Sequence, residues 1–475
     1  METTFTLAHI LEPISGYRPT GQEPPLTDVV TDSREAGAGS LFVAMVGEHH
    51  DGHDFATEAI ERGAAALLVE RAVVPDLLTI DLRGEGPSQW PERWESPVQI
   101  VVDDAVWAIQ EAAAAWRAGL PVRVIGITGS VGKTSTKELT HAVLSTRYCT
   151  FKSPGNRNSI LGLPPALFSL RPEHERAVLE MGMYTTGEIA RLAEITRPAV
   201  GVVTMIDPVH MSRAGSLENI VAAKQELVEG LPADGVAILN HDEPLVMGMQ
   251  THTAARVFTY GLDESADVWA DEIESMGTNG IRFTLHHGRD RLRVQVPLLG
   301  RHSVHTALRA TAVGLVEGLT WEEIVGGLQD EAMELRVVTA TGPMGSLLLD
   351  DTYNASPAST LAALNLLEEL PGRHIAVLGD MLELGAAEEE SHQRVGRRAR
   401  AVSDILVTVG EKARLIAYEA IIAGMPSSRV VWAATPDQAV AVLQDLIEEG
   451  DTVLIKGSRS VGLEAVVSAL AQPSK

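Results

Sequence analysis

The sequence predicts an α/β protein of three domains: a small N-terminal α/β domain, a central P-loop domain on a parallel sheet with an antiparallel extension, and a C-terminal Rossmann-like domain. Three observations support this. The chain has 475 residues, which is too long for one ordinary domain. Apolar runs alternate with helical segments in its second and third parts, as in parallel sheets covered by helices. A glycine-rich phosphate-binding motif also lies between a predicted strand and a predicted helix.

The first domain is predicted over residues 1–104. Residues 40–45 (SLFVAM) and 65–70 (AALLVE) are short apolar runs typical of strands. Residues 83–97 (RGEGPSQWPERWESP) contain too many Gly and Pro residues for a regular element. We expect this passage to be a loop shortly before the domain boundary.

The second domain is predicted over residues 105–333. It opens with an alanine-rich helical segment, 106–119, and apolar runs separated by helical stretches follow. Residues 281–296 (IRFTLHHGRDRLRVQV) alternate between apolar and polar, which predicts two antiparallel strands with a turn at Gly288–Asp290.

The third domain is predicted over residues 334–475, with five apolar runs that are each followed by a helical segment. Several runs end on polar residues, namely Asp350, Asp351, Asp380 and Lys456. Ligands of open α/β sheets bind beyond the carboxyl ends of the strands, so we expect these side chains to converge at a ligand.

The composition excludes some classes of function. The formal net charge is −26, which disfavours nucleic acid as a partner. Cys149 is the only cysteine, so no intramolecular disulfide is possible. We find no signal peptide and no run of about 20 apolar residues. The sequence therefore predicts a cytoplasmic protein without membrane insertion.

The strongest motif comprises Gly129, Ser130, Val131, Gly132, Lys133, Thr134 and Ser135. Its glycines let backbone N–H groups face phosphates, Lys133 neutralises phosphate oxygens, and Thr134 can ligate Mg²⁺. The first glycine of the usual eight-residue pattern would fall on Ile127, so this is a shorter GxxGKT variant. The alternative is a glycine-rich turn with a surface lysine, which the order of strand, loop and helix disfavours.

Three further residues are candidates for the same edge of the sheet. Glu180 ends an apolar run, where an unpaired carboxylate would be costly. His210 follows the next run, and we favour metal binding over a structural role because Glu180 and the P-loop lie nearby. Lys224 taken alone would be a solvated helical lysine. The His49–Asp54 cluster lacks the spacing of zinc ligands and is interpreted as a polar loop near a substrate.

Taken together, these motifs resemble the Mur ligase family over nearly the whole chain. The similar segments are TDSR (31–34), ITGSVGKTSTKE (127–138), SPGNRNSILGLP (153–164), DDTYNASP (350–357), GDMLELG (379–385) and IKGSR (455–459). The combination of DDTYNASP with GDMLELG is similar to the family member that adds D-alanyl-D-alanine to UDP-N-acetylmuramoyl-tripeptide.

The resemblance implies roles for single residues. The P-loop and Lys133 would hold ATP, and Lys133, Glu180, His210 and Lys224 would be catalytic. Thr134, Glu180, His210 and Lys224 would surround Mg²⁺, with Lys224 carbamylated to N6-carboxylysine. The remaining implied contacts are Thr306, Arg336 and Asp351 to the nucleotide, Ser33 and Arg34 to uridine, Tyr353 and Asn354 to the dipeptide, and Asn156, Asn158 and Lys456 to substrate.

The implied reaction activates a carboxylate as an acyl phosphate, which the amine of the dipeptide then attacks. The resemblance implies a monomer whose domains close during turnover. The family usually has Asn at four positions that are Met205, Thr306, Ser159 and Ser356 here. The alternatives are a sibling Mur ligase, a folylpolyglutamate-type ligase, a P-loop NTPase that hydrolyses ATP, or a non-catalytic relative.

Overall fold

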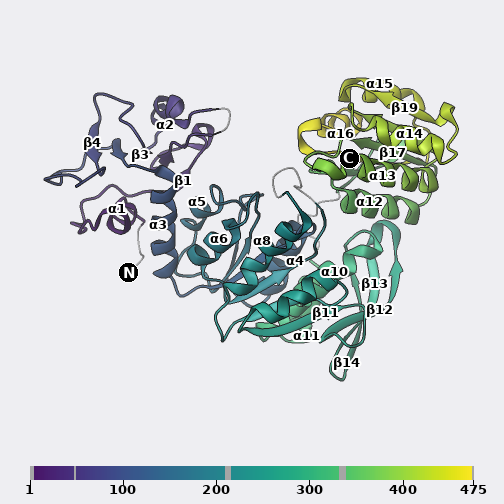
Figure 1. The fold of residues 1–475 in the computed structure, drawn as a ribbon, viewed down its shortest axis with the longest axis horizontal. Helices are drawn as coiled ribbons and strands as arrows, with labels where there is room; N and C mark the ends of the chain where they lie inside the picture. The colour runs from purple at the N-terminus through teal and green to yellow at the C-terminus, as the bar shows by residue number, and fades with distance from the viewer. Residues whose placement is uncertain (1–4, 48–49, 209–214, 331–337, 473–475) are drawn as a thin grey trace.

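The computed structural model describes residues 5–47, 50–208, 215–330 and 338–472. Within these ranges the strands form three separate sheets, one after another along the chain (Figure 1). This arrangement confirms the predicted α/β fold class. The proposed limits at residues 104 and 333 stay predictions.

The N-terminal sheet is parallel, and its described strands lie in the order β1-β2-β3-β5-β4. The two predicted strands are present, and residues 83–97 form no helix or strand, as predicted. The strands are β1 (Val29–Val30), β2 (Leu41–Val43), β3 (Ala66–Val69), β4 (Leu78–Asp81) and β5 (Val98–Val101), with the helices α1 (Ala8–Ser15) and α2 (Ala56–Glu61).

The central sheet has the described order β14-β13-β12-β11-β10-β9-β6-β8-β7. Its strands are parallel from β7 to β12, and β12, β13 and β14 form the predicted antiparallel extension. The strands are β6 (Arg123–Thr128), β7 (Thr150–Lys152), β8 (Arg176–Glu180), β9 (Val200–Val203), β10 (Val236–Asn240), β11 (Arg256–Gly261), β12 (Val268–Ser275), β13 (Ile281–His287) and β14 (Asp290–Val296).

Helices cover both faces of the central sheet because its strands are apolar on both sides. In β6, Val124 packs with one core and its neighbour Ile125 with the other. The helices of the first face are α3 (Ala105–Ala118), α5 (Leu163–Leu167), α6 (Glu188–Thr196) and α8 (Leu217–Glu229), and those of the second are α4 (Lys133–Ser145), α10 (Val304–Val316) and α11 (Trp321–Leu328).

Helix α3 joins the N-terminal and central regions (Figure 1). On one side Trp116 packs against Phe5, with ring centroids 5.2 Å apart, and edge-on against His9 at 5.0 Å. On its other side α3 packs against α5 and α6 of the central region. One continuous apolar core, from Phe5 to Ala255, therefore extends through both regions.

The C-terminal sheet has the described order β15-β16-β20-β17-β18-β19. The five predicted strands are present and parallel, and β15 adds an antiparallel edge that was not predicted. The strands are β15 (Val338–Thr341), β16 (Leu347–Asp351), β17 (His374–Gly379), β18 (Ile405–Val409), β19 (Val430–Ala433) and β20 (Thr452–Lys456), and the helices are α12 (Pro357–Glu369), α13 (Glu388–Val402), α14 (Arg414–Ile422), α15 (Pro436–Leu446) and α16 (Glu464–Leu470).

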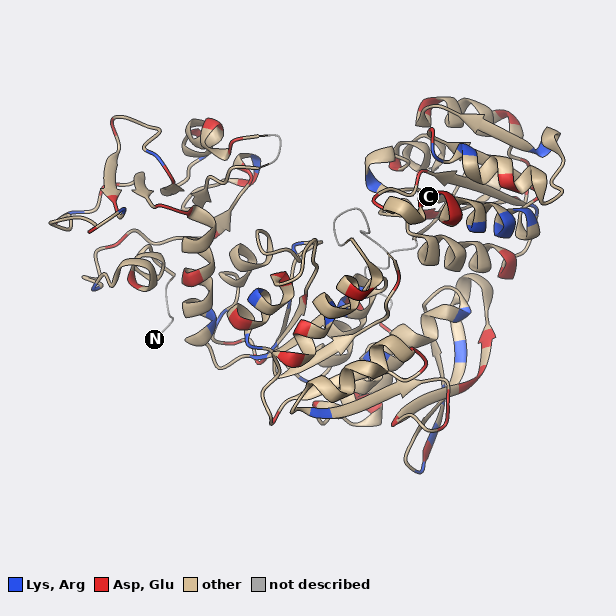
Figure 2. Ribbon diagram, in the orientation of Figure 1, with Lys and Arg blue, Asp and Glu red and all other residues tan. Residues whose placement is uncertain are grey.

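Charged residues are distributed over all three regions rather than gathered in one patch (Figure 2). None of the helices in the described ranges is both long and apolar enough to cross a bilayer.

Candidate active site

The P-loop lies between β6 and α4, at the carboxyl edge of the central sheet, as predicted. Gly129 and Gly132 have φ values of +142° and +85°, which side chains rarely allow. A Cβ atom at Gly129 would also lie 1.8 Å from Thr204 Oγ1. Thr204 Oγ1 donates to the carbonyl of Val131 at 2.7 Å, and the N–H of Ser130 donates to the carbonyl of Met205 at 2.8 Å. Strand β9 and the residues after it therefore hold the loop in shape.

Glu180 lies beside the first turn of α4 and is 2% exposed. One carboxylate oxygen accepts from Thr134 Oγ1 at 2.9 Å, and the other accepts from Asn158 Nδ2 at 2.7 Å. The structure thus brings together three of the predicted site residues. A hydroxyl and a carboxylate at a P-loop are hard oxygen ligands, the type that Mg²⁺ prefers.

Two lysines lie close to this group. Lys133 Nζ donates to the carbonyl of Gly129 at 2.8 Å. Lys224, on α8, is 2% exposed, so it is not the solvated lysine that its sequence alone would suggest. Burial lowers the pKa of Lys224 well below its usual value, and the positive charge of Lys133 lowers it further. This environment favours a neutral amine at Lys224.

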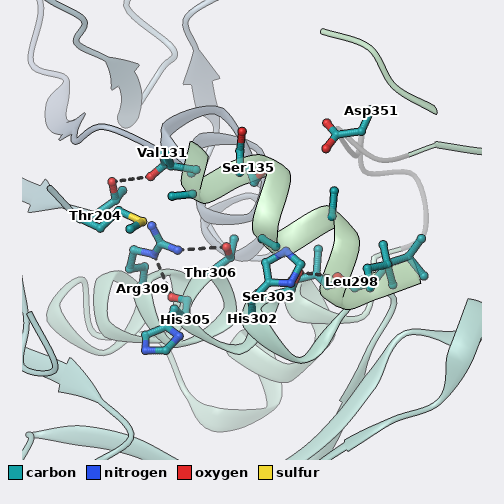
Figure 3. A pocket seen from close by; sticks show the side chains of 18 of the residues that line it. Val131, Ser135, Thr204, Leu298, His302, Ser303, His305, Thr306, Arg309 and Asp351 are labelled. Carbon is teal, nitrogen blue, oxygen red and sulfur yellow. Dashed lines mark hydrogen bonds between the residues drawn. The ribbon is translucent and has the colours of Figure 1, made fainter. Parts of the chain in front are cut away.

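Two adjoining cavities open from the P-loop toward the C-terminal domain. The first, about 320 Å³, contains Val131, Gly132 and Ser135 from the loop and helix α4, and Thr306 and Asp351 from opposite sides (Figure 3). The second, about 480 Å³, is more polar and contains Ser130, Val131 and Lys133. Its other predicted residues are Asn156, Tyr353 and Asn354.

Lys456 lines the first cavity together with Asp351, so the two strand ends converge as expected. Its predicted contact with substrate stays a prediction. Lys456 Nζ donates to Asp351 Oδ2 at 2.6 Å and to the carbonyl of Asn354 at 2.8 Å. The pair joins the ends of β16 and β20, and it holds in place the loop that carries Tyr353 and Asn354.

The predicted uridine contacts lie in the N-terminal domain. Ser33 is buried and donates to Glu58 at 2.8 Å, whereas Arg34 is largely exposed and pairs with Asp32 at 2.6 Å. Next to them Glu35 forms an ion pair with Arg157, in the loop that carries Asn156 and Asn158. Through its neighbour Glu35, the segment of Ser33 and Arg34 thus contacts that loop. Neither Ser33 nor Arg34 lines the two cavities.

Two predicted residues, His210 and Arg336, lie outside the described residues, as does His49 of the N-terminal histidine cluster. His53 of that cluster is buried and bonded to Asp51 at 2.6 Å, and it accepts from the N–H of Glu70 at 2.9 Å. Within the described ranges no three His, Cys, Asp or Glu side chains gather as metal ligands.

Sequence analysis missed three residues of the site. Lys137 is completely buried and donates to the carbonyls of Ser153 and Gly155 at 2.9 and 2.7 Å, which fixes the loop before Asn156. Asp207 follows β9, and burial raises the pKa of its carboxyl.

The third missed residue is Arg309, which lines the first cavity from α10. It lies three positions after Thr306, a spacing that places both on one face of a helix. This spacing is the signal in the sequence that points to Arg309.

Known proteins share this architecture. Three family models match: "Mur ligase family, catalytic domain" at residues 25–118, "Mur ligase middle domain" at 127–314, and "Mur ligase, glutamate ligase domain" at 335–459. UDP-N-acetylmuramoyl-tripeptide–D-alanyl-D-alanine ligase of Escherichia coli is 36% identical over 98% of both chains, and that of Bacillus subtilis is 35% identical with the same coverage.

Solved structures agree with these sequence matches. A crystal structure of MurF from Acinetobacter baumannii has a TM-score of 0.82 at 29% identity over 98% of both chains. MurF ligase from Thermotoga maritima in complex with ADP has a TM-score of 0.76 at 26% identity, covering 93% of this chain and 96% of that one.

The three-domain fold and the P-loop site thus define an ATP-dependent amide ligase. The chain belongs to the Mur ligase family.

Proposed function

We propose that the chain joins the amine of D-alanyl-D-alanine to the terminal carboxylate of UDP-N-acetylmuramoyl-tripeptide, with ATP converted to ADP and phosphate. The observation that carries this proposal is the second cavity, where Lys133 of the P-loop faces Tyr353 and Asn354 of the C-terminal domain. ATP on the P-loop and the amine of the dipeptide can bind close to each other in this cavity. The full-length similarity to ligases named for this reaction supports the choice of substrates.

The carboxylate must be activated before an amine can attack it, because oxide is a poor leaving group. A carboxylate oxygen attacks the γ-phosphorus of ATP, the bond to the β-phosphate oxygen breaks, and ADP leaves. The dipeptide amine then attacks the acyl carbon, phosphate departs, and the amine loses a proton. Lys133 and the amides of the P-loop offset negative charge on the transferring phosphoryl group.

Mg²⁺ fits the oxygen atoms of Thr134 and Glu180, which lie 2.9 Å apart at the P-loop. Bound there, it would stabilise charge on the phosphates. We propose His210 and a carbamylated Lys224 as further ligands, since a neutral buried amine can take up CO₂ and gain a carboxylate. Asn158 orients Glu180 from the opposite side.

The other predicted contacts are part of the same proposal. Arg336, Asp351 and Thr306 would contact the nucleotide, Ser33 and Arg34 the uridine group, and Asn156 the acceptor peptide. A cytoplasmic location and a monomeric state stay predictions from the sequence.

Phosphate release tests the proposed function. The protein is incubated with ATP, UDP-N-acetylmuramoyl-tripeptide and D-alanyl-D-alanine, and each component is omitted in turn. Release should require both the tripeptide and the dipeptide, and single amino acids should not replace the dipeptide. Release without an amine would indicate an NTPase, and release with a single amino acid would indicate a sibling ligase.

A further inference from the structure

Lys137 lies one turn after Lys133 in α4, but it lines neither of the two cavities. Its side chain is 0% exposed. Lys137 Nζ donates to the carbonyl of Ser153 at 2.9 Å and to that of Gly155 at 2.7 Å, and it lies 3.2 Å from Glu138 Oε1. An ammonium group has three donors, and these three partners use all of them. Lys137 therefore acts on the protein itself and not on a ligand.

The two carbonyls belong to the loop of residues 153–158, which follows β7. This loop carries Asn156 into the second cavity and Asn158 onto Glu180. Asn158 Nδ2 donates to Glu180 Oε1 at 2.7 Å, and the carbonyl of Asn158 accepts from the N–H of Gly182 at 2.7 Å. A Cβ atom at Gly182 would lie 2.8 Å from Asn158 Oδ1. Asn158 thus packs directly against the chain that leaves β8.

Ser153 connects the same loop to β8 at a second point. Its N–H donates to the carbonyl of Val178 at 3.0 Å, and its Oγ accepts from the N–H of Glu180 at 3.1 Å. The loop therefore bonds to both the main chain and the carboxylate of Glu180. The other carboxylate oxygen of Glu180 accepts from Thr134 Oγ1 at 2.9 Å. A shift of the loop would change the direction of this carboxylate.

We propose that Lys137 is a positioning residue for the metal site. It fixes the loop so that Asn158 holds the Glu180 carboxylate beside Thr134, in the orientation that binds Mg²⁺. Metal ligands depend on such supporting groups, which orient them before the ion arrives. Without Lys137, two carbonyls of the loop would lose their donor, and the loop would move toward other donors. The proposal rests on the Mg²⁺ site of the proposed function.

The alternative is that Lys137 only stabilises the fold, and the chain offers a matched control for it. Glu138 lies between two lysines, because Lys152 of β7 also pairs with it and is 33% exposed. Replacing either lysine by methionine leaves Glu138 with the other one. Of these two lysines, only Lys137 donates to the loop carbonyls within the part of the chain that the structure describes.

The test measures how much Mg²⁺ improves the affinity for ADP. Calorimetry on the full chain gives the dissociation constant of ADP in excess Mg²⁺ and in EDTA, and the ratio of the two is the gain from the metal. Lys137→Met should reduce this gain about tenfold, the usual loss when a group that orients a metal ligand is removed. The affinity in EDTA should stay the same, because Lys137 lines neither cavity. Lys152→Met should retain the wild-type gain, and thermal unfolding checks that both variants are folded.

A double variant tests the route of the effect. Asn158→Ala should also reduce the gain, and Lys137→Met combined with Asn158→Ala should lose little more than the stronger single variant, because both act through one chain of bonds. Additive losses would contradict this route. If Lys137→Met does not fold, Lys137→Arg replaces it. Its planar fork cannot reproduce the three directions of an ammonium, so the gain should fall in that variant too.

A wild-type gain in folded Lys137→Met, or an equal loss in Lys152→Met, would overturn the proposal. So would a loss of ADP affinity in Lys137→Met that is the same with and without Mg²⁺, since the metal site would then be intact. A wild-type protein whose affinity for ADP does not depend on Mg²⁺ would instead refute the Mg²⁺ site of the proposed function. The two failures are therefore distinguishable.

Discussion

Lys224, in the middle of α8, and Lys456, at the end of β20, are two buried lysines whose surroundings differ. Lys456 has a carboxylate partner, Asp351, at 2.6 Å. The acidic side chain that acts on Lys224 is Glu226, but its carboxylate accepts from the N–H groups of Gly187 and Ala190 at 2.6 and 2.9 Å. Lys224 also experiences the positive charge of Lys133.

The difference shows that the surroundings of a buried lysine, and not burial alone, decide which role it can have. Lys456 forms an ion pair with Asp351, and this contact joins two strands of the C-terminal sheet. Among the described residues no carboxylate is paired with Lys224, and burial together with the positive charge of Lys133 lowers its pKa, which favours the neutral amine. Because only a neutral amine can react with CO₂, this difference supports the proposed carbamylation of Lys224 but not of Lys456.

The largest effect is expected for the third lysine, Lys133. Lys133→Ala should reduce ligation by about a thousandfold or more, since a preorganised cation at the phosphoryl group is lost. The fold should persist, because the side chain of Lys133 is only partly buried and is not part of an apolar core. Steady-state phosphate release and circular dichroism check both statements. Turnover close to wild type in folded protein would refute the P-loop assignment.

Lys224→Ala should lower activity by about a hundredfold, because the carboxylate created by carbamylation is lost. Acetate or another small carboxylic acid should restore part of this activity by entering the space left by the side chain. The same acid should not restore Lys133→Ala, which serves as the control. Full activity of Lys224→Ala without added acid would show that the lysine has no such role.

The smallest expected effect is a loss of stability in Lys456→Met. It leaves the carboxylate of Asp351 without its cation at a buried position, which should lower the free energy of unfolding by about 2 kcal/mol. Lys412→Met removes the partner of Glu388 in a more exposed pair and should cost less than about 1 kcal/mol. Urea denaturation compares the two. An equal loss of unfolding free energy in both variants would mean that the buried Lys456–Asp351 pair stabilises the protein no more than an exposed ion pair does.

Local patterns predicted much of the fold. The order of strand, glycine loop and helix around Lys133 depends on near neighbours in the chain, as does the alternation in 281–296, and both are confirmed. Strand β15 was missed because its residues Val338–Thr341 are mostly exposed at a sheet edge and form no apolar run. Its position depends on pairing with β16, which no local pattern contains.

The site was harder to predict because its groups meet through tertiary contacts. Lys137 lies four residues after Lys133 in sequence, but its carbonyl partners come from a loop 16 to 18 residues further along. Lys456 and Asp351 are 105 residues apart in sequence, so their pairing could not be inferred from either segment. Serine at position 356, one of the four departures from the family pattern, proves to be the N-cap of α12.

The core shared through α3 has a consequence for synthesis of the protein. Its members run from Phe5 to Ala255, so the N-terminal residues wait for partners that leave the ribosome much later. Phe5 and Trp116, for example, both pack against Phe168, with ring centroids 5.1 and 6.3 Å apart. The C-terminal cores contain few residues of the earlier regions. The first half of the chain can therefore complete its core only after residue 255 has been made, whereas the C-terminal domain has cores of its own.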